Sequence, residues 1–479
     1  MSRPARHRAV VVGAGLTGLA AAWRVRDAVE VTVLEASDRA GGEIRTVRFA
    51  GAPFDVGADA FLARQPEAER LARDAGFGDE DLVAPATGAV SLWVDGRRRP
   101  LPEGTVLGAP TDLRAVARSG VLGPGALLRA AAEPVLPRRQ IVGDRSVADL
   151  VGERFGHEVV DRLVEPLLGG VYAGQADRLS AQAAAAPLWD AASQHRSLAR
   201  ALTRRRATST SDQPVFLTLR GGLGRLVDRL AGDLGARLHR DAEVVTIERG
   251  SADARWQVRT ASGATVLADT LVLAVPSAQA ARLLGDVSAE AARELAAIPS
   301  ASVGVVAMAY PRPVGSGGPQ GSGVLVPRTE GRIVKAITFA SNKWPQHADH
   351  RHVLLRASVG RIDDDAPLHW DDAQLVEAVD REVRELADLD AAPVETEVTR
   401  WWQALPQHEV GHLLRVDRVR AALRRDAPGL HLGGASLDGI GLAARARDGA
   451  RLAHEIRWEA GLIDPSGQVP YERPEVPPG

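Results

Sequence analysis

The chain of 479 residues is 45% hydrophobic and 25% charged, and its formal net charge is −2. These values are typical of a soluble globular protein and exclude a strongly basic surface for nucleic acid; the length requires more than one core, since single cores stop growing near roughly 250–300 residues. The sequence contains no cysteine, which excludes disulfides, thiolate metal sites and cysteine nucleophiles.

The first predicted elements are a strand, a tight turn, a helix and a second strand. The apolar run 9–12 leads into Gly13-Ala14-Gly15-Leu16-Thr17-Gly18, an Ala-rich stretch covers 19–26, and a β-branched run over 29–34 is followed by Glu35. This order predicts a βαβ unit with two parallel strands. No signal-peptide cleavage site follows the basic start, and no apolar run reaches the ~18 residues of a membrane span, so we expect a cytoplasmic protein.

The glycine-rich turn has the spacing of a dinucleotide-binding motif, Gly-x-Gly-x-x-Gly. Gly13 permits the tight turn, Gly15 lets the backbone approach a pyrophosphate, and Gly18 lets the helix meet the strand closely. Glu35 stands where a carboxylate can accept the ribose hydroxyls, and its charge disfavours a 2′-phosphate. The alternative is a glycine turn in a sheet that binds nothing, but the strand–turn–helix context and the acid favour binding.

Further along the chain, two blocks interrupt the strand–helix alternation. Gly and Pro separate short helices from about residue 87, 147–168 is predicted as one helix, strands dominate 302–359, and a last helix covers 442–458. We therefore predict an α/β fold, a discontinuous and doubly wound Rossmann-like domain with an inserted helical subdomain and an inserted α+β domain. The expected boundaries are 1–86, 214–290 and 406–479 for the nucleotide-binding domain, the last with the C-terminal tail, 87–213 for the helical subdomain and 291–405 for the strand-rich domain.

Two stretches after Glu35 resemble the FAD-dependent amine oxidase and porphyrinogen oxidase superfamily. Residues 36–42, with Arg39 and a glycine pair, resemble its second signature, and residues 55–60 resemble its loop beside the isoalloxazine ring. The resemblance implies FAD as cofactor. A flavin reductase that uses NAD(P)H would usually carry a second Gly-x-Gly-x-x-Gly, which the sequence lacks, so an oxidase with O2 as acceptor is favoured.

Five more stretches, in the same order along the chain, resemble coproporphyrinogen III and protoporphyrinogen IX oxidases of the soluble Gram-positive type. They are 165–174, 195–198, 219–223, 402–412 and 432–442. Departures are Ala58 where proline is common, His408 in place of a usual tyrosine, and Ala443 and Ala444 in place of Gly or Asn.

The motif and the resemblance together assign the expected site residues. Cofactor contacts are expected at Gly13, Ala14, Gly15, Leu16, Thr17, Gly18, Glu35, Ala36, Arg39, Gly42, Glu43, Gly57, Ala58, Asp59, Ala60, Val244, Trp402, Gly434, Ile440, Gly441 and Leu442. Substrate contacts are expected at Gly169 and Gly170, which would let a flat ring approach the backbone or else end a helix. A further contact is expected at Arg196, which could hold a propionate or else be a solvated surface residue. The sequence singles out no catalytic base.

The resemblance implies oxidation of coproporphyrinogen III to coproporphyrin III in haem biosynthesis, with six electrons removed in three hydride transfers and O2 reduced to H2O2. Protoporphyrinogen IX is the nearest alternative substrate. An amine is a weaker one, because only 4% of the residues are aromatic. Hand-over of product to the next enzyme of haem synthesis is implied, peripheral membrane contact through 106–136 stays open beside ordinary packing, and no oligomeric state is indicated.

A rival motif is His408-Glu409-Val410-Gly411-His412, which matches the zinc-protease pattern. Pro406 and the internal Gly411 argue against the helix that this pattern needs, and no glutamate follows until Glu455 to act as a third ligand. We therefore expect no bound metal.

Overall fold

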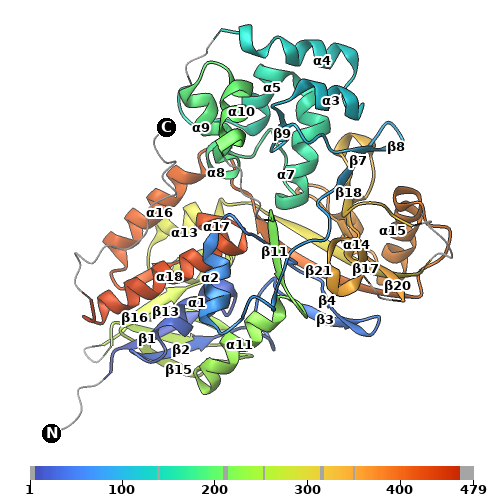
Figure 1. Cartoon of the computed structure of the whole chain (residues 1–479). Coiled ribbons are helices and arrows are strands. Elements are labelled where there is room, and N and C mark those ends of the chain that lie inside the picture. Colours follow the sequence, from blue (N-terminus) through green and yellow to red (C-terminus); the bar gives the residue numbers. More distant parts are fainter. Residues whose placement is uncertain are drawn as a thin grey trace.

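The structure is a computed structural model that describes residues 6–137, 141–208, 214–251, 254–312, 318–348 and 351–463. Three lobes meet at the centre of the molecule (Figure 1): one around a parallel sheet, one around a largely antiparallel sheet, and one made mostly of helices. Among the described residues, no helix combines the length and the apolarity needed to cross a bilayer.

The parallel sheet is assembled from three separate parts of the chain. Its strand order is β12-β2-β1-β16-β22, and every neighbouring pair is parallel. The bounds are β1 Arg8–Val12, β2 Glu30–Leu34, β12 Leu238–His239, β16 Thr270–Leu273 and β22 Leu430–Leu432. The central strands β1 and β16 are almost entirely buried, which explains their largely apolar sequences. The Rossmann-like α/β domain is therefore present and discontinuous.

Each face of this sheet has its own cover. One core cluster joins the sheet to α1 (Leu16–Val25), α2 (Pro66–Asp74), α11 (Gly224–Leu234) and α18 (Leu442–Glu459). The other joins it to β13 (Val244–Arg249), β14 (Trp256–Thr260), β15 (Thr265–Ala268), α12 (Ser277–Leu284), α13 (Ala289–Ala296) and α16 (His412–Asp426). Helices α1 and α18 cross closely, because a Cβ atom at Gly449 would lie 2.7 Å from Cβ of Ala20.

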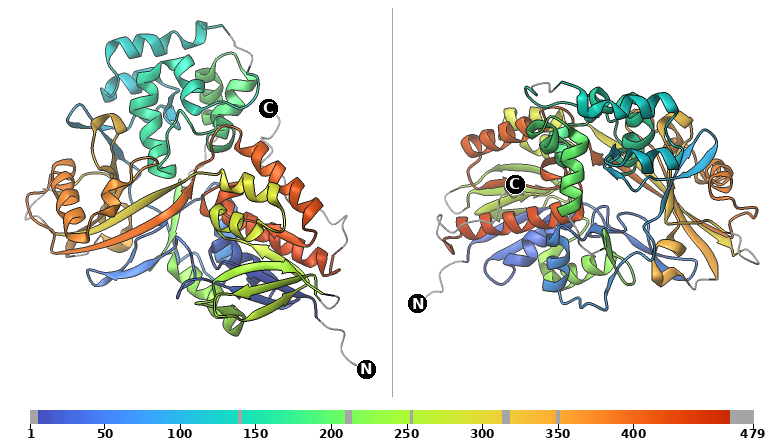
Figure 2. Two further views of the ribbon diagram at one scale, coloured as in Figure 1. Left: turned by 180° about the vertical axis from the view of Figure 1, so that it is seen from behind. Right: turned by 45° about the horizontal axis from the view of Figure 1, so that its top comes forward.

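The second lobe is built on a seven-stranded sheet with the order β21-β17-β20-β19-β18-β7-β8. Its strands are β7 Val90–Val94, β8 Arg97–Pro100, β17 Ser300–Pro311, β18 Gly323–Leu325, β19 Val334–Thr338, β20 His352–Val359 and β21 Glu395–Pro406. Helix α15 (Asp372–Ala387) packs on one face, and Figure 2 shows the sheet beside the helical lobe. Strands β7 and β8 fall in the range expected to be helical (87–213), and they join this sheet because β7 pairs in parallel with β18.

The helical lobe contains α3 (Leu113–Ser119), α4 (Pro124–Ala131), α5 (Val147–Phe155), α7 (Glu165–Tyr172), α9 (Ala186–Gln194) and α10 (Leu198–Thr208). The single helix expected over 147–168 is interrupted after α5, where Gly156 has φ +97. A short helix, α6 (His157–Val159), and a π-helical turn over 160–164 then lead into α7, which has Pro166 near its start. The chain thus turns between α5 and α7 instead of continuing straight.

Two small sheets connect the lobes. Strands β3 (Thr46–Phe49) and β4 (Ala52–Asp55) form a hairpin, and β11 (Phe216–Leu219) pairs with β5 (Phe61–Leu62) and with β6 (Leu82–Val83). The hairpin packs its two phenylalanines, Phe49 and Phe54, against Ala307 and Ala309 of β17. This contact fixes the nucleotide-binding lobe against the seven-stranded sheet.

Candidate functional site

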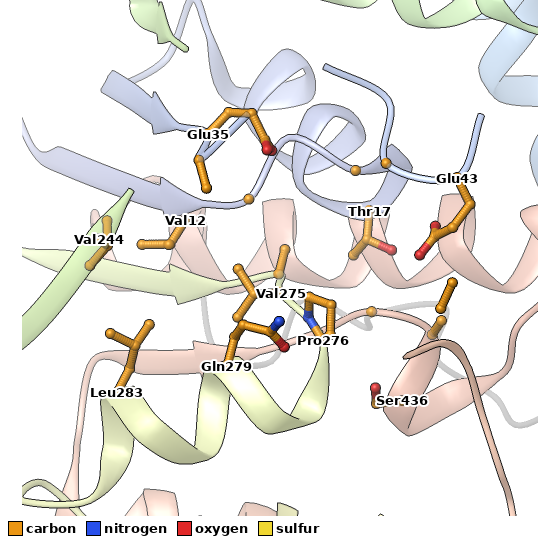
Figure 3. Close-up of a pocket in the computed structure, with 18 of the residues that line it drawn as sticks. Val12, Thr17, Glu35, Glu43, Val244, Val275, Pro276, Gln279, Leu283 and Ser436 are labelled. Carbon is orange, nitrogen blue, oxygen red and sulfur yellow. The ribbon is translucent and has the colours of Figure 1, made fainter. Parts of the chain in front are cut away.

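A cavity of about 530 Å³ lies at the carboxyl ends of β1, β2 and β16, in front of the N-terminus of α1. This edge is where open α/β sheets bind ligands. In Figure 3, Glu35 and Val244 lie toward one end of the cavity and Thr17, Glu43 and Ser436 toward the other. Its wall comes from five regions of the chain, which are 12–17, 34–43, 243–283, 403–406 and 434–445.

The glycines of the first turn have three different roles. Gly13 has φ +99, and a Cβ atom there would lie 2.6 Å from the carbonyl oxygen of Ala274. A Cβ at Gly18 would overlap the carbonyl oxygen of Gly13, so Gly18 brings α1 against the strand. Gly15 has φ −66 and lines the cavity, and no described atom lies within 4 Å of its Cβ position. Only Gly15 therefore leaves room that a ligand could fill.

Glu35 is held rigidly at the end of β2. Its Oε2 accepts a hydrogen bond from the backbone N–H of Ala14 at 2.6 Å, and its Oε1 accepts from the backbone N–H and Oγ of Ser37 at 3.0 and 2.7 Å. The carboxylate also lines the cavity. Since a carboxylate has about four acceptor positions and three are used, Glu35 keeps about one for a hydroxyl group of a ligand.

The loop after Glu35 returns to the glycine turn. The backbone N–H of Gly41 donates to the carbonyl oxygen of Ala14 at 2.8 Å, which places Gly42 and Glu43 in the cavity wall. Arg39 donates instead to backbone carbonyls within its own loop, among them that of Gly42 at 2.6 Å. The structure therefore places Arg39 where it shapes this loop.

The next predicted stretch, 57–60, lies where the nucleotide-binding lobe meets the seven-stranded sheet. Asp59 forms ion pairs with Lys343 at 3.1 Å and with Arg356 at 3.4 Å, and Arg356 also donates to the carbonyl oxygen of Gly57. Burial by itself would raise the pKa of Asp59, but the two cations lower it below its usual range. None of Gly57, Ala58, Asp59 and Ala60 is in the cavity wall, so their predicted cofactor contacts stay predictions.

A β-bulge in β21 determines which of two neighbouring tryptophans points inward. Gln403 has φ +48 and its N–H donates to Oγ of Ser302, and the pairing of β21 with β17 shifts register at this point. Trp402 is 50% exposed and its ring packs 5.0 Å from that of His369. Trp401 points inward and donates to the carbonyl oxygen of Val56 at 3.0 Å. The structure thus turns the expected residue, Trp402, outward, because a bulge shifts the alternation of the strand.

The last glycine-rich turn contributes only its first half to the cavity. Gly434 lines the cavity together with the two residues after it, and its N–H donates to Oδ2 of Asp448 at 2.6 Å. Ile440 packs toward the helical lobe, Gly441 precedes α18, and Leu442 is buried in the core beside α1. The contacts predicted for 440–442 are therefore not in the cavity wall.

The two histidines of the zinc-protease pattern hold this same turn. Their rings stack with centroids 4.1 Å apart, and both are buried. Nε2 of His408 is 3.0 Å from the carbonyl oxygen of Ala435, and Nε2 of His412 is 3.1 Å from that of Leu437. A nitrogen that bonds a carbonyl carries the proton and is closed to a metal. No metal-binding cluster occurs among the described residues.

Burial determines the charge of both rings. It lowers the pKa of His408 to about 3, with a further contribution from His412, and it lowers the pKa of His412 as well. Both are therefore neutral at pH 7. The pair acts as a neutral support beneath the turn at 434–437.

The predicted substrate residues lie in the helical lobe. Gly169 and Gly170 are inside α7, which ends at Tyr172 with Ala173 in the left-handed region (φ +51), so they do not end the helix. A Cβ at Gly170 would lie 3.5 Å from Cδ2 of Leu325, and none of the described atoms lies within 4 Å of a Cβ at Gly169. The glycines thus leave a bare helix surface facing β18.

Arg196 lies on the exterior of the helical lobe, where its guanidinium is 3.4 Å from the carbonyl oxygen of Val135. The residues after it have a clear structural role. Oγ of Ser197 and the N–H of Leu198 both donate to the buried carboxylate of Glu133 at 2.7 Å. The stretch 195–198 therefore anchors the start of α10, and Arg196 is separate from the cavity wall.

Several cavity residues were not anticipated from the sequence. They are Val12, Leu34, Glu243, Val245, Ala274, Val275, Pro276, Gln279, Arg282, Leu283, Gln403, Ala404, Pro406, Ala435, Ser436 and Arg445. A usable signal existed for 274–276, because these residues follow a run of β-branched and apolar residues at 270–273, and open α/β sheets bind ligands beyond the carboxyl ends of their strands. No local pattern marks Arg445, which is one of many arginines in the chain.

The cavity fits a dinucleotide on three observations. Its volume lies within the roughly 300–1,000 Å³ of small-molecule sites, and the open position at Gly15 is beside the N-terminus of α1, whose dipole favours phosphate. The Nε of Arg445 is buried in the wall and has no hydrogen-bond partner among the described residues, as expected of a donor that awaits an anionic ligand.

Comparison with known proteins agrees with this geometry. Residues 16–453 match the family described as flavin containing amine oxidoreductase. The chain is similar to coproporphyrinogen III oxidases of Mycobacterium tuberculosis (39% identity, 91% of this chain and 94% of the relative) and Bacillus subtilis (31%, 92% and 96%). It also resembles the crystal structure of a putative protoporphyrinogen oxidase from Exiguobacterium (TM-score 0.85, 30% identity, 95% and 99% coverage). A UDP-galactopyranose mutase (TM-score 0.70, 18% identity, 95% and 96% coverage) shares the fold.

Proposed function

Because the chain belongs to the family of flavin-containing amine oxidoreductases, we propose that it uses its cofactor, FAD, to oxidise coproporphyrinogen III to coproporphyrin III. The observation that carries the proposal is the 39% identity to a coproporphyrinogen III oxidase over 91% of the chain. When bound, FAD would supply the hydride acceptor for this chemistry, and three two-electron oxidations, with O2 reduced to H2O2 each time, would remove the six electrons. We place this reaction in the cytoplasm.

The residues of the chain bind and orient the reactants. The glycine turn and Glu35 hold the adenosine half of the cofactor, and the bulged segment 403–406 together with the turn 434–436 encloses the other half. The helix α7 is tied to this enclosure, since Nε2 of Gln407 donates to the carbonyl oxygen of Tyr172 at 2.8 Å. We place the macrocycle against the bare surface of α7 at Gly169 and Gly170.

The reaction needs orientation and a dry site more than an added base. The surface of α7 at Gly170 has an apolar neighbour, Leu325, and Leu168 of the same helix belongs to the buried core of the helical lobe. An apolar wall suits a macrocycle whose polar groups are peripheral carboxylates. We assign proton loss to the conjugated macrocycle itself and name no catalytic base.

Initial rates with coproporphyrinogen III and protoporphyrinogen IX, with peroxide quantified, test the substrate. We expect faster oxidation of coproporphyrinogen III and three H2O2 per porphyrin formed. Anaerobic bleaching of the bound flavin by coproporphyrinogen III but not by benzylamine would separate this function from amine oxidation. Equal or reversed preference between the two porphyrinogens would contradict the choice of substrate, and bleaching by benzylamine alone would contradict the reaction class.

The variant Gly169→Val tests the position of the macrocycle. Its side chain has room in the protein, so the variant should fold and keep FAD while KM for coproporphyrinogen III rises at least tenfold. The control is Gly232→Val in α11, an exposed helical glycine whose Cβ position is equally open. An unchanged KM in Gly169→Val would place the substrate elsewhere.

A further inference from the structure

Glu43 and Arg445 form an ion pair inside the cofactor cavity. Both residues line the cavity, and Nη1 of Arg445 donates to Oε2 of Glu43 at 2.6 Å. They come from distant parts of the chain, Glu43 from the loop after β2 and Arg445 from the first turn of α18. The pair is therefore a product of the fold that no local motif encodes.

The pair lies next to the glycine turn that would receive phosphate. Gly41 forms a bridge with Gly15, and a Cβ at Gly42 would be 3.4 Å from Cα of Gly15. Glu43 follows immediately in the chain. On the other side, the carbonyl oxygen of Arg445 accepts from Oγ1 of Thr17, the second residue of α1. Both members of the pair are thus attached to the start of α1.

A carboxylate at this place opposes the binding of a diphosphate, because like charges repel and a partly buried pair is weakly screened. Arg445 removes this obstacle by neutralising Glu43. Arg445 also has a hydrogen-bond donor that no protein group uses. The residue is only 7% exposed, and its Nε has no hydrogen-bond partner among the described residues. A guanidinium has five N–H donors and matches phosphate oxygens well.

We propose that Arg445 is the pyrophosphate-binding cation of this protein and that Glu43 orients it by holding one edge of its guanidinium. Glu43 accepts from Nη1 and fixes the plane of the group, while the remaining donors stay available to the phosphate oxygens. The inference rests on FAD being the ligand of the cavity and is independent of which porphyrinogen is oxidised.

The test is the rate at which FAD leaves the holoenzyme, followed as the rise in free flavin fluorescence. We expect Arg445→Gln to release FAD at least tenfold faster than the parent chain, and competition by added ADP to weaken in parallel while competition by adenosine stays unchanged. The matched control is Arg447→Gln, on the same helix, whose partner Glu67 lies at 3.3 Å outside the cavity. An unchanged release rate for Arg445→Gln would overturn the proposal.

A second variant separates the role in phosphate binding from a general loss of structure. In Arg445→Gln the unpaired Glu43 repels phosphate, so the double variant Glu43→Gln/Arg445→Gln should release FAD more slowly than Arg445→Gln alone. A purely structural ion pair would change the competition by adenosine as much as the competition by ADP in both variants, and this outcome would contradict the proposal. Because neither measurement involves a porphyrinogen, failure of the proposed substrate leaves this test intact.

Discussion

The parallel sheet and the seven-stranded sheet place function in different ways. In the parallel sheet, β1 and β2 are neighbours in sequence, and the chemistry lies at strand ends, in Gly15 and Glu35. In the seven-stranded sheet, β7 pairs with β18 more than 200 residues away, and its contribution to the site depends on one bulge at Gln403. The contribution of the parallel sheet to the site can be predicted from a short motif. The contribution of the seven-stranded sheet forms only after distant segments of the chain pair.

The largest expected effect distinguishes two glycines of the same motif. Gly18→Val should prevent folding, because its side chain would overlap the backbone of Gly13. Gly15→Val should fold but purify without flavin, since the new side chain fills only the cavity. Circular dichroism and flavin absorbance measure the two outcomes. Stoichiometric FAD in Gly15→Val would show that the site is misplaced.

The next largest effect concerns the contribution of the ion pairs of Asp59, between two lobes, to the free energy of unfolding. Asp59→Asn leaves Lys343 and Arg356 without their carboxylate, and we expect a loss of about 3 kcal/mol in the free energy of unfolding. Asp74→Asn, which removes an exposed partner of Arg24, should cost less than about 1 kcal/mol. Urea unfolding measures both. Equal losses would mean that the contact at Asp59 contributes no more than a surface pair.

Two histidines should give opposite dependences of stability on pH. Burial lowers the pKa of His408 to about 3, so the unfolded chain binds a proton below pH 6.5 that the folded chain does not, and stability falls as the pH falls. Burial by itself would lower the pKa of His431, but Glu455 and Glu459 raise it to about 9. The contribution of His431 to the free energy of unfolding is therefore complete below pH 6.5 and is lost as the pH rises through 9.

Unfolding free energies at several pH values test this contrast. Between pH 6.5 and pH 5, the parent chain should lose about 2 kcal/mol more than His408→Gln does. Between pH 7 and pH 9, the parent chain should lose more than His431→Gln does. Parallel profiles for a variant and the parent chain would contradict the corresponding assignment.

The smallest effect concerns the two tryptophans at the bulge. Trp401→Phe removes the hydrogen bond to the carbonyl oxygen of Val56, which should cost about 1 kcal/mol. Trp402→Phe keeps an aromatic ring beside His369 on the exterior and should stay within about 0.5 kcal/mol of the parent chain. Thermal unfolding ranks the two variants. The reverse order would mean that Trp402 is the inward residue.

Elements with a regular local pattern could be predicted from the sequence. The expected helix over 442–458 agrees with α18 within one residue, and the first βαβ unit agrees within a few residues. Their apolar residues repeat at the period of the element. Within the site, the spacing of the first motif indicated Gly15 and Glu35, the resemblance indicated Gly434, and all three line the cavity.

What escaped prediction depends on long-range pairing. Strand β21 has no clear apolar alternation, since most of its residues are partly exposed, and only pairing with β17 makes it a strand. The inward turn of Trp401 follows from the bulge, which one sequence does not reveal. Arg445 belongs to the site only because α18 crosses α1, and no spacing within α18 indicates that crossing.

The crossing of α1 and α18 has a consequence for biogenesis. The glycine turn emerges from the ribosome first, but the cavity that surrounds it also needs Arg445 and the turn at 434. At roughly 5–20 residues per second, about 430 residues separate these events by some 20–90 seconds. A nascent chain therefore cannot retain FAD until its C-terminal helix, α18, has been synthesised. Chains truncated before this helix should be colourless.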